Sequence, residues 1–356
     1  MASGGTFPSA EETMKHPAYA GVIWNLEPTK KGLLPCAIGR GGPIDISWEI
    51  HGTGPRRILF VMGLAGLATS WQRQTKHFAH DHGDEYSVLL IDNRGIGLSG
   101  SPLQRYTTSQ MARDVLEVLE HVGWTETPRS LHVCGISLGG MISQELALLI
   151  PDLIASLTLL CTAASVETLR NLPSVLYERA GMIIPKPAEE AIRNTALQIF
   201  TSEYLHAPDE AKELPVPGVT PNCKPPPGAD SYARFDSNFQ RFQAQELTKR
   251  GDKRLFTAKG FLLQLIAAGF HVKSPAQLRE LGDKVGRERI AVIHGTRDNM
   301  IDVKFGRKLI EGLQPSVGMI VDGMGHAPVM ENVEWFKKFF TERIELGEKL
   351  RSEASA

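Results

Sequence analysis

Residues 131–140 read LHVCGISLGG and contain the pattern G-x-S-x-G at Gly135, Ser137 and Gly139. A short apolar run precedes the serine and an amphipathic helix is predicted to follow it, which is the strand–turn–helix setting that this pattern requires. The glycines on either side leave room for a sharp turn with a strained backbone at Ser137. We therefore expect the serine hydroxyl above the carboxyl edge of a sheet, at a helix N-terminus that stabilises developing negative charge.

Further continuous apolar runs lie outside this stretch, and such runs are typical of strands covered on both faces of a parallel sheet. They occur at 58–62, 87–91, 157–161, 290–293 and 319–321. Amphipathic helical patterns separate them, at 109–122, 138–149, 304–313 and 333–344. A period of two at 44–50 predicts one half-buried strand. The alternation predicts an α/β fold with a mostly parallel central sheet flanked by helices.

The alternation of strands and helices stops between residues 165 and 285. This stretch has helical patterns at 188–200, 238–248 and 258–270, and a proline-rich loop at 214–228 that cannot be helix or sheet interior. We predict a helical cap, which either covers the pocket as a lid or is a purely structural elaboration. The predicted parts are an N-terminal surface extension (1–42), a core (43–164 and 286–346), the cap (165–285) and a C-terminal tail (347–356).

A serine hydroxyl becomes an effective nucleophile only when a nearby base removes its proton. After a serine in this setting, an acid and then a histidine are expected later in the sequence, each just past the end of a strand. The segment RIAVIHGTRD ends in Asp298 and the segment MIVDGMGH ends in His326, so both fit this order. Asp302, four residues beyond Asp298, is the alternative acid. The sequence thus predicts a triad of Ser137, Asp298 and His326.

An oxyanion hole needs two convergent backbone amides. The amide of Leu138 directly follows the serine and is the first predicted donor. The segment VMGLAG (61–66) follows an earlier strand, and its Leu64 amide is the second. Gly63 is expected in the substrate pocket. Trp71 follows the same loop and either contacts the substrate or packs under the cap.

These segments together resemble the α/β-hydrolase superfamily, in its capped, serine-hydrolase branch. The resemblance covers about 43–164 and 286–346 and depends on the elbow GISLGG, the acid segment HGTRD, the base segment GMGHAP and the segment DNRGIGLSG (92–100). It implies that Asp92 and Arg94 are structural. Many members have His-Gly where this chain has Met62-Gly63, which implies a difference in loop anchoring or substrate preference, since the oxyanion chemistry uses backbone groups.

Composition excludes several other classes of protein. The 356 residues contain 39 basic and 40 acidic side chains, which argues against a nucleic-acid surface. No apolar run is long enough for a membrane span, and the first 25 residues lack a signal core. Four scattered cysteines without a C-x-x-C pair suit a reduced, cytoplasmic protein and argue against a thiolate metal site. Gly95-Ile96-Gly97 is no dinucleotide fingerprint, so we expect neither a metal nor a cofactor.

Histidines outside the triad are expected to be structural. His77, His80 and His82 are predicted on a solvated helix end and loop, while His132 and His294 are predicted as hydrogen-bonded core groups. The resulting hypothesis is a carboxylesterase-like serine hydrolase that acts on a small, partly apolar ester, lactone or thioester. Acyl transfer and C–C bond hydrolysis on the same triad remain open, as does a ligand-sensing protein that has lost catalysis. The sequence does not assign an oligomeric state.

Overall fold

The computed structural model describes residues 6–166, 187–209 and 213–355. The strands of this part of the chain form one sheet in the order β1-β2-β4-β3-β5-β6-β7-β8. Pairing is parallel from β4 to β8 and antiparallel on both sides of β2. The mostly parallel sheet is therefore confirmed. The strand bounds are β1 Lys30–Cys36, β2 Ile44–Gly52, β3 Arg56–Val61, β4 Tyr86–Ile91, β5 Leu131–Ile136, β6 Ile154–Leu160, β7 Ile290–Gly295 and β8 Val317–Val321.

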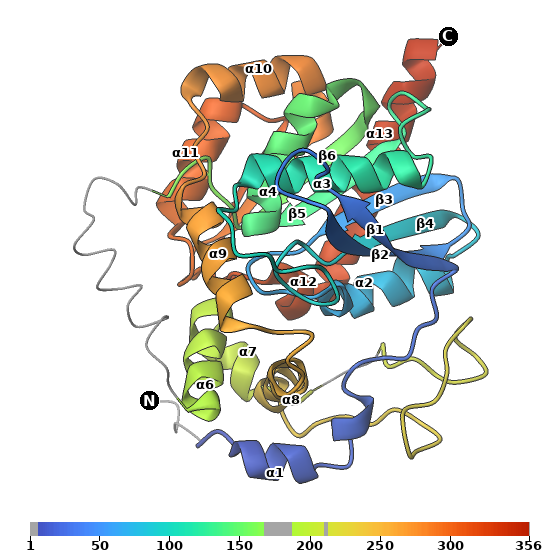
Figure 1. The fold of residues 1–356 in the computed structure, drawn as a ribbon, viewed down its shortest axis with the longest axis vertical. Coiled ribbons are helices and arrows are strands. Elements are labelled where there is room, and N and C mark those ends of the chain that lie inside the picture. The colour runs from blue at the N-terminus through green and yellow to red at the C-terminus, as the bar shows by residue number, and fades with distance from the viewer. Residues whose placement is uncertain (1–5, 167–186, 210–212, 356) are drawn as a thin grey trace.

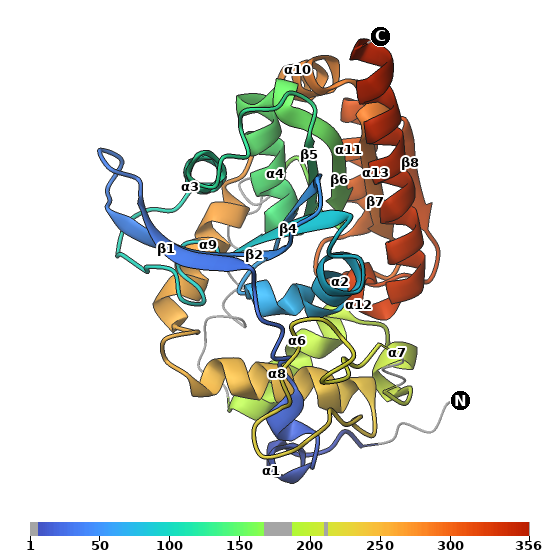
Figure 2. The same ribbon diagram turned by 90° about the vertical axis from the view of Figure 1, so that its right-hand side faces the viewer.

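Helices cover both faces of this sheet (Figure 2). One face buries the apolar sides of α3 (Thr108–His121), α4 (Leu138–Leu149), α10 (Pro275–Val285) and α11 (Val303–Leu313). The opposite face carries α13 (Val333–Ser355), with aromatic side chains of the segment around α2 (Gln72–Thr75). Because both faces are covered, the inner strands are apolar without alternation, and β4, β5, β6 and β7 are buried along their whole length.

A helical layer lies at one end of the sheet domain, at the bottom of Figure 1. It comprises α6 (Ala188–Ile199), α7 (Ser202–His206) and α8 (Asn238–Gly251), which share an apolar cluster with Phe200 and Phe242. The short helix α1 (Ala10–Lys15) packs against α8, and the buried Thr13 hydroxyl donates a hydrogen bond to Gln243. The helix α9 (Ala258–Gly269) connects this layer to the sheet domain, since Leu263 and Ala267 join the core beside the sheet.

The structure corrects three predicted boundaries. Residues 30–36 are no surface extension, because β1 pairs with β2 along its length; Pro35 fits there because an edge strand tolerates a missing amide donor. Residues 275–285 lie outside the cap layer, since α10 packs beside α11 with Leu278, Leu281 and Leu313 in one cluster. The tail continues α13 through Gly347, where a Cβ would lie 2.8 Å from the Ala155 carbonyl oxygen; glycine thus lets the helix lie close to β6.

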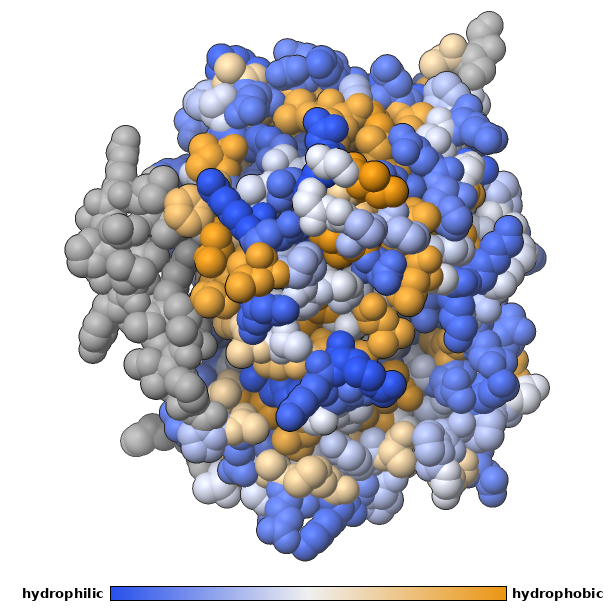
Figure 3. All heavy atoms as spheres, in the orientation of Figure 1, coloured by the Kyte–Doolittle hydropathy of each residue, from blue (hydrophilic) through white to orange (hydrophobic). Residues whose placement is uncertain are grey.

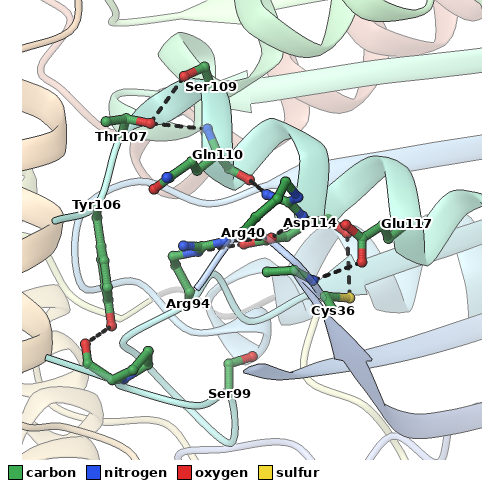
Figure 4. Close-up of polar contacts among 12 residues, drawn as sticks. Cys36, Arg40, Arg94, Ser99, Tyr106, Thr107, Ser109, Gln110, Asp114 and Glu117 are labelled. Atoms are coloured by element: carbon green, nitrogen blue, oxygen red, sulfur yellow. Dashed lines mark hydrogen bonds and ion pairs between the residues drawn. The ribbon is translucent and has the colours of Figure 1, made fainter. Parts of the chain in front are cut away.

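The segment after β4 is a scaffold, as the resemblance implied. The Asp92 carboxylate accepts hydrogen bonds from the amides of Ala68 (2.8 Å) and Leu98 (3.0 Å), and burial raises its pKa to about 6. Arg94 forms two hydrogen bonds of 2.5 and 2.6 Å to Asp114 on α3 (Figure 4). Both side chains therefore fix the loop between β4 and α3 to its neighbours.

The face of the protein seen in Figure 3 is mixed in polarity. In Figure 3, hydrophilic residues are interspersed with smaller apolar patches, the ordinary pattern for a folded domain. None of the helices in the described part of the chain combines the length and the apolar character needed to cross a bilayer.

Candidate active site

Ser137 lies in the turn between β5 and α4 and has φ 56° and ψ −124°, a backbone conformation that residues with a Cβ rarely adopt. The glycines around it are required by close packing. A Cβ at Gly139 would lie 2.1 Å from the Val61 carbonyl oxygen, and one at Gly135 would lie 2.3 Å from the Ser143 hydroxyl. The motif thus lets α4 start directly against β3, with Ser137 at the helix N-terminus.

Asp298 and His326, which follow β7 and β8, are brought together by the parallel pairing of these strands. The Nδ1 atom of His326 lies 2.7 Å from Oδ2 of Asp298. The other oxygen, Oδ1, accepts hydrogen bonds from the amides of Met300 (2.9 Å) and Ile301 (2.8 Å). Both side chains are buried. The alternative acid, Asp302, is exposed and caps α11, where it accepts a hydrogen bond from the Lys304 amide.

A second histidine contacts the same carboxylate. Nε2 of His294 lies 3.1 Å from Oδ2 of Asp298 and 2.8 Å from the carbonyl oxygen of Ile301. No described residue pairs with its buried Nδ1 atom, so Nε2, which faces a carbonyl oxygen, is the nitrogen that donates. Burial alone would raise the pKa of Asp298, but His326 and His294 together hold it well below its ordinary value.

The loop after β3 forms a tight turn beside Ser137. The Gly66 amide donates to the Gly63 carbonyl oxygen at 3.1 Å, and Ala65 has φ 56°. In a trans peptide the N–H points away from the carbonyl, so the Leu64 N–H is directed out of the turn. Across residues 6–166, 187–209 and 213–355, nothing accepts a hydrogen bond from the amide of Leu64 or of Leu138.

These residues meet in one cavity of about 730 Å³. Ser137, His326, Gly63, Leu64 and Leu138 all line it. A Cβ at Gly63 would lie 2.9 Å from Cβ of Ser137, so a glycine is needed for the loop to lie this close. The helices α6, α8 and α9 supply the opposite wall, in which apolar residues alternate with polar ones on α6 and with charged ones on α8. Its lining residues include Phe200, Phe242, Phe256, Phe261, Leu265, Glu246, Lys249 and Arg250.

Trp71 is not among the residues that line this cavity. Its indole is fully buried on the other face of the sheet, where it stacks on Phe60 at a centroid distance of 4.5 Å and lies near Phe336 of α13. Both alternatives predicted for Trp71, contact with the substrate and packing under the cap, are therefore wrong. The short helical turn after the loop directs the ring toward the sheet.

Sequence reasoning missed a carboxylate that supports the histidine loop. Glu331, at the end of α12 (Pro328–Glu331), accepts a hydrogen bond from the Gly325 amide (2.9 Å) and two from the amide and hydroxyl of Thr201 (2.6 and 2.8 Å). The His326 amide in turn donates to the Ile199 carbonyl oxygen at 2.7 Å. The loop is thus attached to the end of α6, a contact for which the sequence carries no local signal.

Two other histidines predicted as structural make buried contacts, one of them against the predicted solvent exposure. His132 contacts Ser156 and Glu348 as a paired core group. His80 is buried rather than solvated: its Nδ1 lies 2.6 Å from the Pro221 carbonyl oxygen and its Nε2 lies 3.0 Å from His51. These contacts attach the proline-rich loop to the sheet domain.

One group of side chains in the described part of the chain has the spacing of metal ligands: Cys161, Asp298 and His326. The Cys161 thiol is buried, which raises its pKa far above the ordinary value, and it donates a weak hydrogen bond to the Gly325 carbonyl oxygen at 3.7 Å. A thiol that stays protonated is a poor ligand. Since Asp298 and His326 bond to each other, the group fits an acid–base pair better than a metal centre.

Known proteins share this fold. The profile of the alpha/beta hydrolase fold family matches residues 56–333. The chain is similar to a thermophilic esterase from Thermogutta terrifontis, with a TM-score of 0.64 and 18% identity over 90% of this chain and 99% of that one. It is also similar to the enol-lactonase from Burkholderia xenovorans, with a TM-score of 0.61 and 19% identity over 87% and 99%. At these identities the likeness concerns the fold.

Two sequence relatives match over shorter regions. The chain is 38% identical over 119 residues to RutD of Azorhizobium caulinodans, a carbamate hydrolase by name, covering 33% of this chain and 42% of that protein. It is 32% identical over 171 residues to 3-oxoadipate enol-lactonase 2 of Acinetobacter baylyi, covering 48% and 60%. The matches thus span about half the length of these relatives. Because the family profile extends over most of the chain, from β3 to the start of α13, the protein belongs to the alpha/beta hydrolase fold family.

Proposed function

We propose that the protein is a serine hydrolase that cleaves a carboxylic ester, lactone or thioester through an acyl-enzyme. One observation carries this proposal: Ser137 and His326 line the same cavity, while Asp298 binds Nδ1 of the same imidazole at 2.7 Å. With its Nδ1 proton donated to Asp298, His326 has its other nitrogen available as a base.

In the proposed mechanism, His326 accepts the Ser137 proton as the serine oxygen attacks the substrate carbonyl carbon. The oxyanion then receives hydrogen bonds from the amides of Leu64 and Leu138, with the N-terminus of α4 adding favourable electrostatics. Support comes from these two amides, which have no acceptor among the described residues. His326 next donates its proton to the leaving group, which leaves Ser137 acylated.

Water then hydrolyses the acyl-enzyme, with His326 again acting first as base and then as acid. His326 removes a proton from water, which attacks the acyl carbon, and the proton then returns to Ser137 as the acid departs. Asp298 stays ionised throughout and stabilises the imidazolium. The Met300 and Ile301 amides support this role because both donate to the carboxylate, and the His294 imidazole lies 3.1 Å from its other oxygen.

The cavity also supports a proposal about the substrate. Its apolar lining residues, among them Phe200, Phe242, Phe261 and Leu265, favour a small molecule with an apolar acyl or alcohol part. We further propose that the layer of α6, α8 and α9 is the cap that shapes the pocket. The similarity to an esterase and to enol-lactonases agrees with an ester or lactone bond. The four cysteines are free thiols, which supports a reducing, cytoplasmic location.

A panel of p-nitrophenyl esters and lactones tests the proposal. The wild-type protein is expected to hydrolyse at least one of them and to be labelled stoichiometrically by a fluorophosphonate. Ser137→Ala should lose both turnover and labelling, while Ser109→Ala, an exposed serine on α3, should retain both. Retained turnover in Ser137→Ala would refute the assignment.

Two further results would favour one of the alternative functions instead. Ester products with an added alcohol would indicate acyl transfer, because an acceptor then replaces water. Stabilisation by a ligand, without turnover across the panel and without labelling, would indicate a binding protein.

A further inference from the structure

Ala65, the left-handed residue of the turn after β3, is held at both of its backbone groups by side chains of α8 and α9. Its N–H donates to Oε1 of Gln264 at 2.9 Å, and its carbonyl oxygen accepts from Nζ of Lys249 at 3.0 Å. Gln264 is fully buried and Lys249 nearly so. From this arrangement we infer that Lys249 and Gln264 are positioning residues that set the Leu64 amide of the oxyanion hole.

The geometry of the turn connects these contacts to that amide. Ala65 has φ 56°, a value that a residue with a Cβ adopts only when its surroundings hold it there. The Gly63–Leu64 peptide, whose N–H is the proposed donor, lies one residue earlier. Among the described residues, the turn that contains this peptide is closed by the hydrogen bond from the Gly66 amide to the Gly63 carbonyl oxygen. If Ala65 relaxed to a negative φ, this turn would open and the Leu64 N–H would rotate away from the oxyanion.

Both side chains are themselves fixed. Nε2 of Gln264 donates to the Arg94 carbonyl oxygen at 2.9 Å, in the buried loop after β4. Lys249 pairs with Glu246, whose carboxylate also accepts from Nε of Arg250 at 3.0 Å. The two helices thus hold one hydrogen-bond donor, Nζ of Lys249, and one acceptor, Oε1 of Gln264, in fixed positions against Ala65. Their layer would then do more than cover the cavity, since it completes the catalytic geometry.

The inference rests on the proposed serine mechanism and predicts a defect specific to the transition state. Gln264→Leu and Lys249→Met should each lower kcat about 10- to 100-fold with KM changed less than about 3-fold, because a misplaced oxyanion donor affects mainly the transition state. Affinity for butylboronic acid, which forms a tetrahedral adduct with serine, should fall by a similar factor. Lys249→Arg retains a donor and should recover most of the activity.

Gln243→Leu is the matched control. Gln243 is a fully buried glutamine of α8 that pairs with Thr13 of α1, away from the turn. Its loss should lower the melting temperature while kcat stays within about 2-fold, as expected for a change that leaves the catalytic geometry alone. If Lys249→Met does not fold, Lys249→Met/Glu246→Gln removes the buried carboxylate together with its partner and serves the same measurements.

The possible results separate the two proposals. Folded Gln264→Leu and Lys249→Met proteins with wild-type kcat and boronate affinity would overturn the inference, as would a rise in KM alone. A wild-type protein that neither reacts with a fluorophosphonate at Ser137 nor hydrolyses any ester would instead overturn the proposed function.

Discussion

The imidazole of His294 lies 3.1 Å from the carboxylate of Asp298, on the same oxygen that contacts Nδ1 of His326. Both residues are buried; His294 lies in β7, and Asp298 follows four positions later, just past the end of that strand. Nε2 of His294 also lies 2.8 Å from the Ile301 carbonyl oxygen, and this hydrogen bond fixes the ring beside the carboxylate. His294 therefore holds one oxygen of the acid in place while the Met300 and Ile301 amides hold the other.

Replacing His294 with leucine should lower both stability and activity. Leucine would leave the Ile301 carbonyl oxygen without its hydrogen bond from His294, and an unsatisfied buried acceptor should lower the free energy of unfolding by about 1–3 kcal/mol. A carboxylate that is less well fixed should lower kcat about 10-fold, because small errors in orientation are costly. His132→Leu, a buried strand histidine away from the cavity, should cost similar stability and leave kcat unchanged. Equal kcat losses in the two variants would contradict this role.

Asp298→Asn should reduce kcat by about 10⁴-fold. An asparagine amide can donate to Nδ1 of His326 and favour the tautomer that cannot accept the serine proton, the effect seen in serine proteases. Asp302→Asn tests the alternative acid and should leave kcat within about 2-fold, since this exposed side chain only caps α11. Steady-state kinetics on one ester measure both variants. A larger loss for Asp302→Asn would reverse the assignment.

Glu331→Gln should lower activity by loosening the loop that carries His326. The ionised carboxylate accepts from the Gly325 amide and from both donors of Thr201, whereas an amide offers one accepting oxygen. We expect kcat to fall about 3- to 30-fold, with a melting temperature lowered by a few degrees. Glu334→Gln, which changes a mostly exposed carboxylate near the start of α13, is the control and should change neither. Unchanged kcat in Glu331→Gln would exclude a positioning role.

Stability should fall in mildly acidic solution because of His271. Burial, with help from the nearby Lys273 charge, lowers the pKa of His271 to about 3. Between that value and about 6.5, the unfolded chain binds a proton that the folded protein does not. The contribution of His271 to the free energy of unfolding is therefore complete above pH 6.5. It decreases by about 1.4 kcal/mol per pH unit as the pH falls toward 3.

Urea unfolding at pH 7.5, 6 and 5 measures this slope. His271→Gln, whose side chain does not titrate, should flatten the curve over this interval. The neighbouring groups are Thr108 at 2.8 Å, Glu145 at 3.7 Å and Lys273, and they remain in the variant. An unchanged slope would mean that His271 titrates normally in the folded state.

Local patterns in the sequence were sufficient for much of the architecture and the candidate site. The apolar runs predicted β3 to β8, and the helical insertion between β6 and β7 was visible as a break in the alternation. The order of Ser137, Asp298 and His326, each placed just past a strand, was also readable. Parallel strands bring such positions to one edge, so strand order carries much of the spatial information.

Sequence reasoning failed where glycine and proline have tertiary roles. The strand β1 was not predicted because it contains Gly32 and Pro35, which are uncommon inside strands. An edge strand tolerates both residues. The helical pattern was predicted to end at residue 344, with a tail from 347, but α13 continues through Gly347, where a Cβ would lie 2.8 Å from the Ala155 carbonyl oxygen of β6. Trp71 was placed in the pocket because it follows the oxyanion loop, although the direction of its side chain depends on the helical turn that follows.

By itself, therefore, the sequence determined the inner strands β3 to β8 and most of the helices that flank them, and which residue types stand at the strand ends. Those features depend on periodicity and on the local backbone, which neighbouring residues control. Only the tertiary structure decided that Asp298 rather than Asp302 faces His326, that His294 shares its carboxylate, and that Lys249 and Gln264 hold Ala65. These contacts join elements far apart in the chain, and their geometry depends on packing that no local pattern encodes.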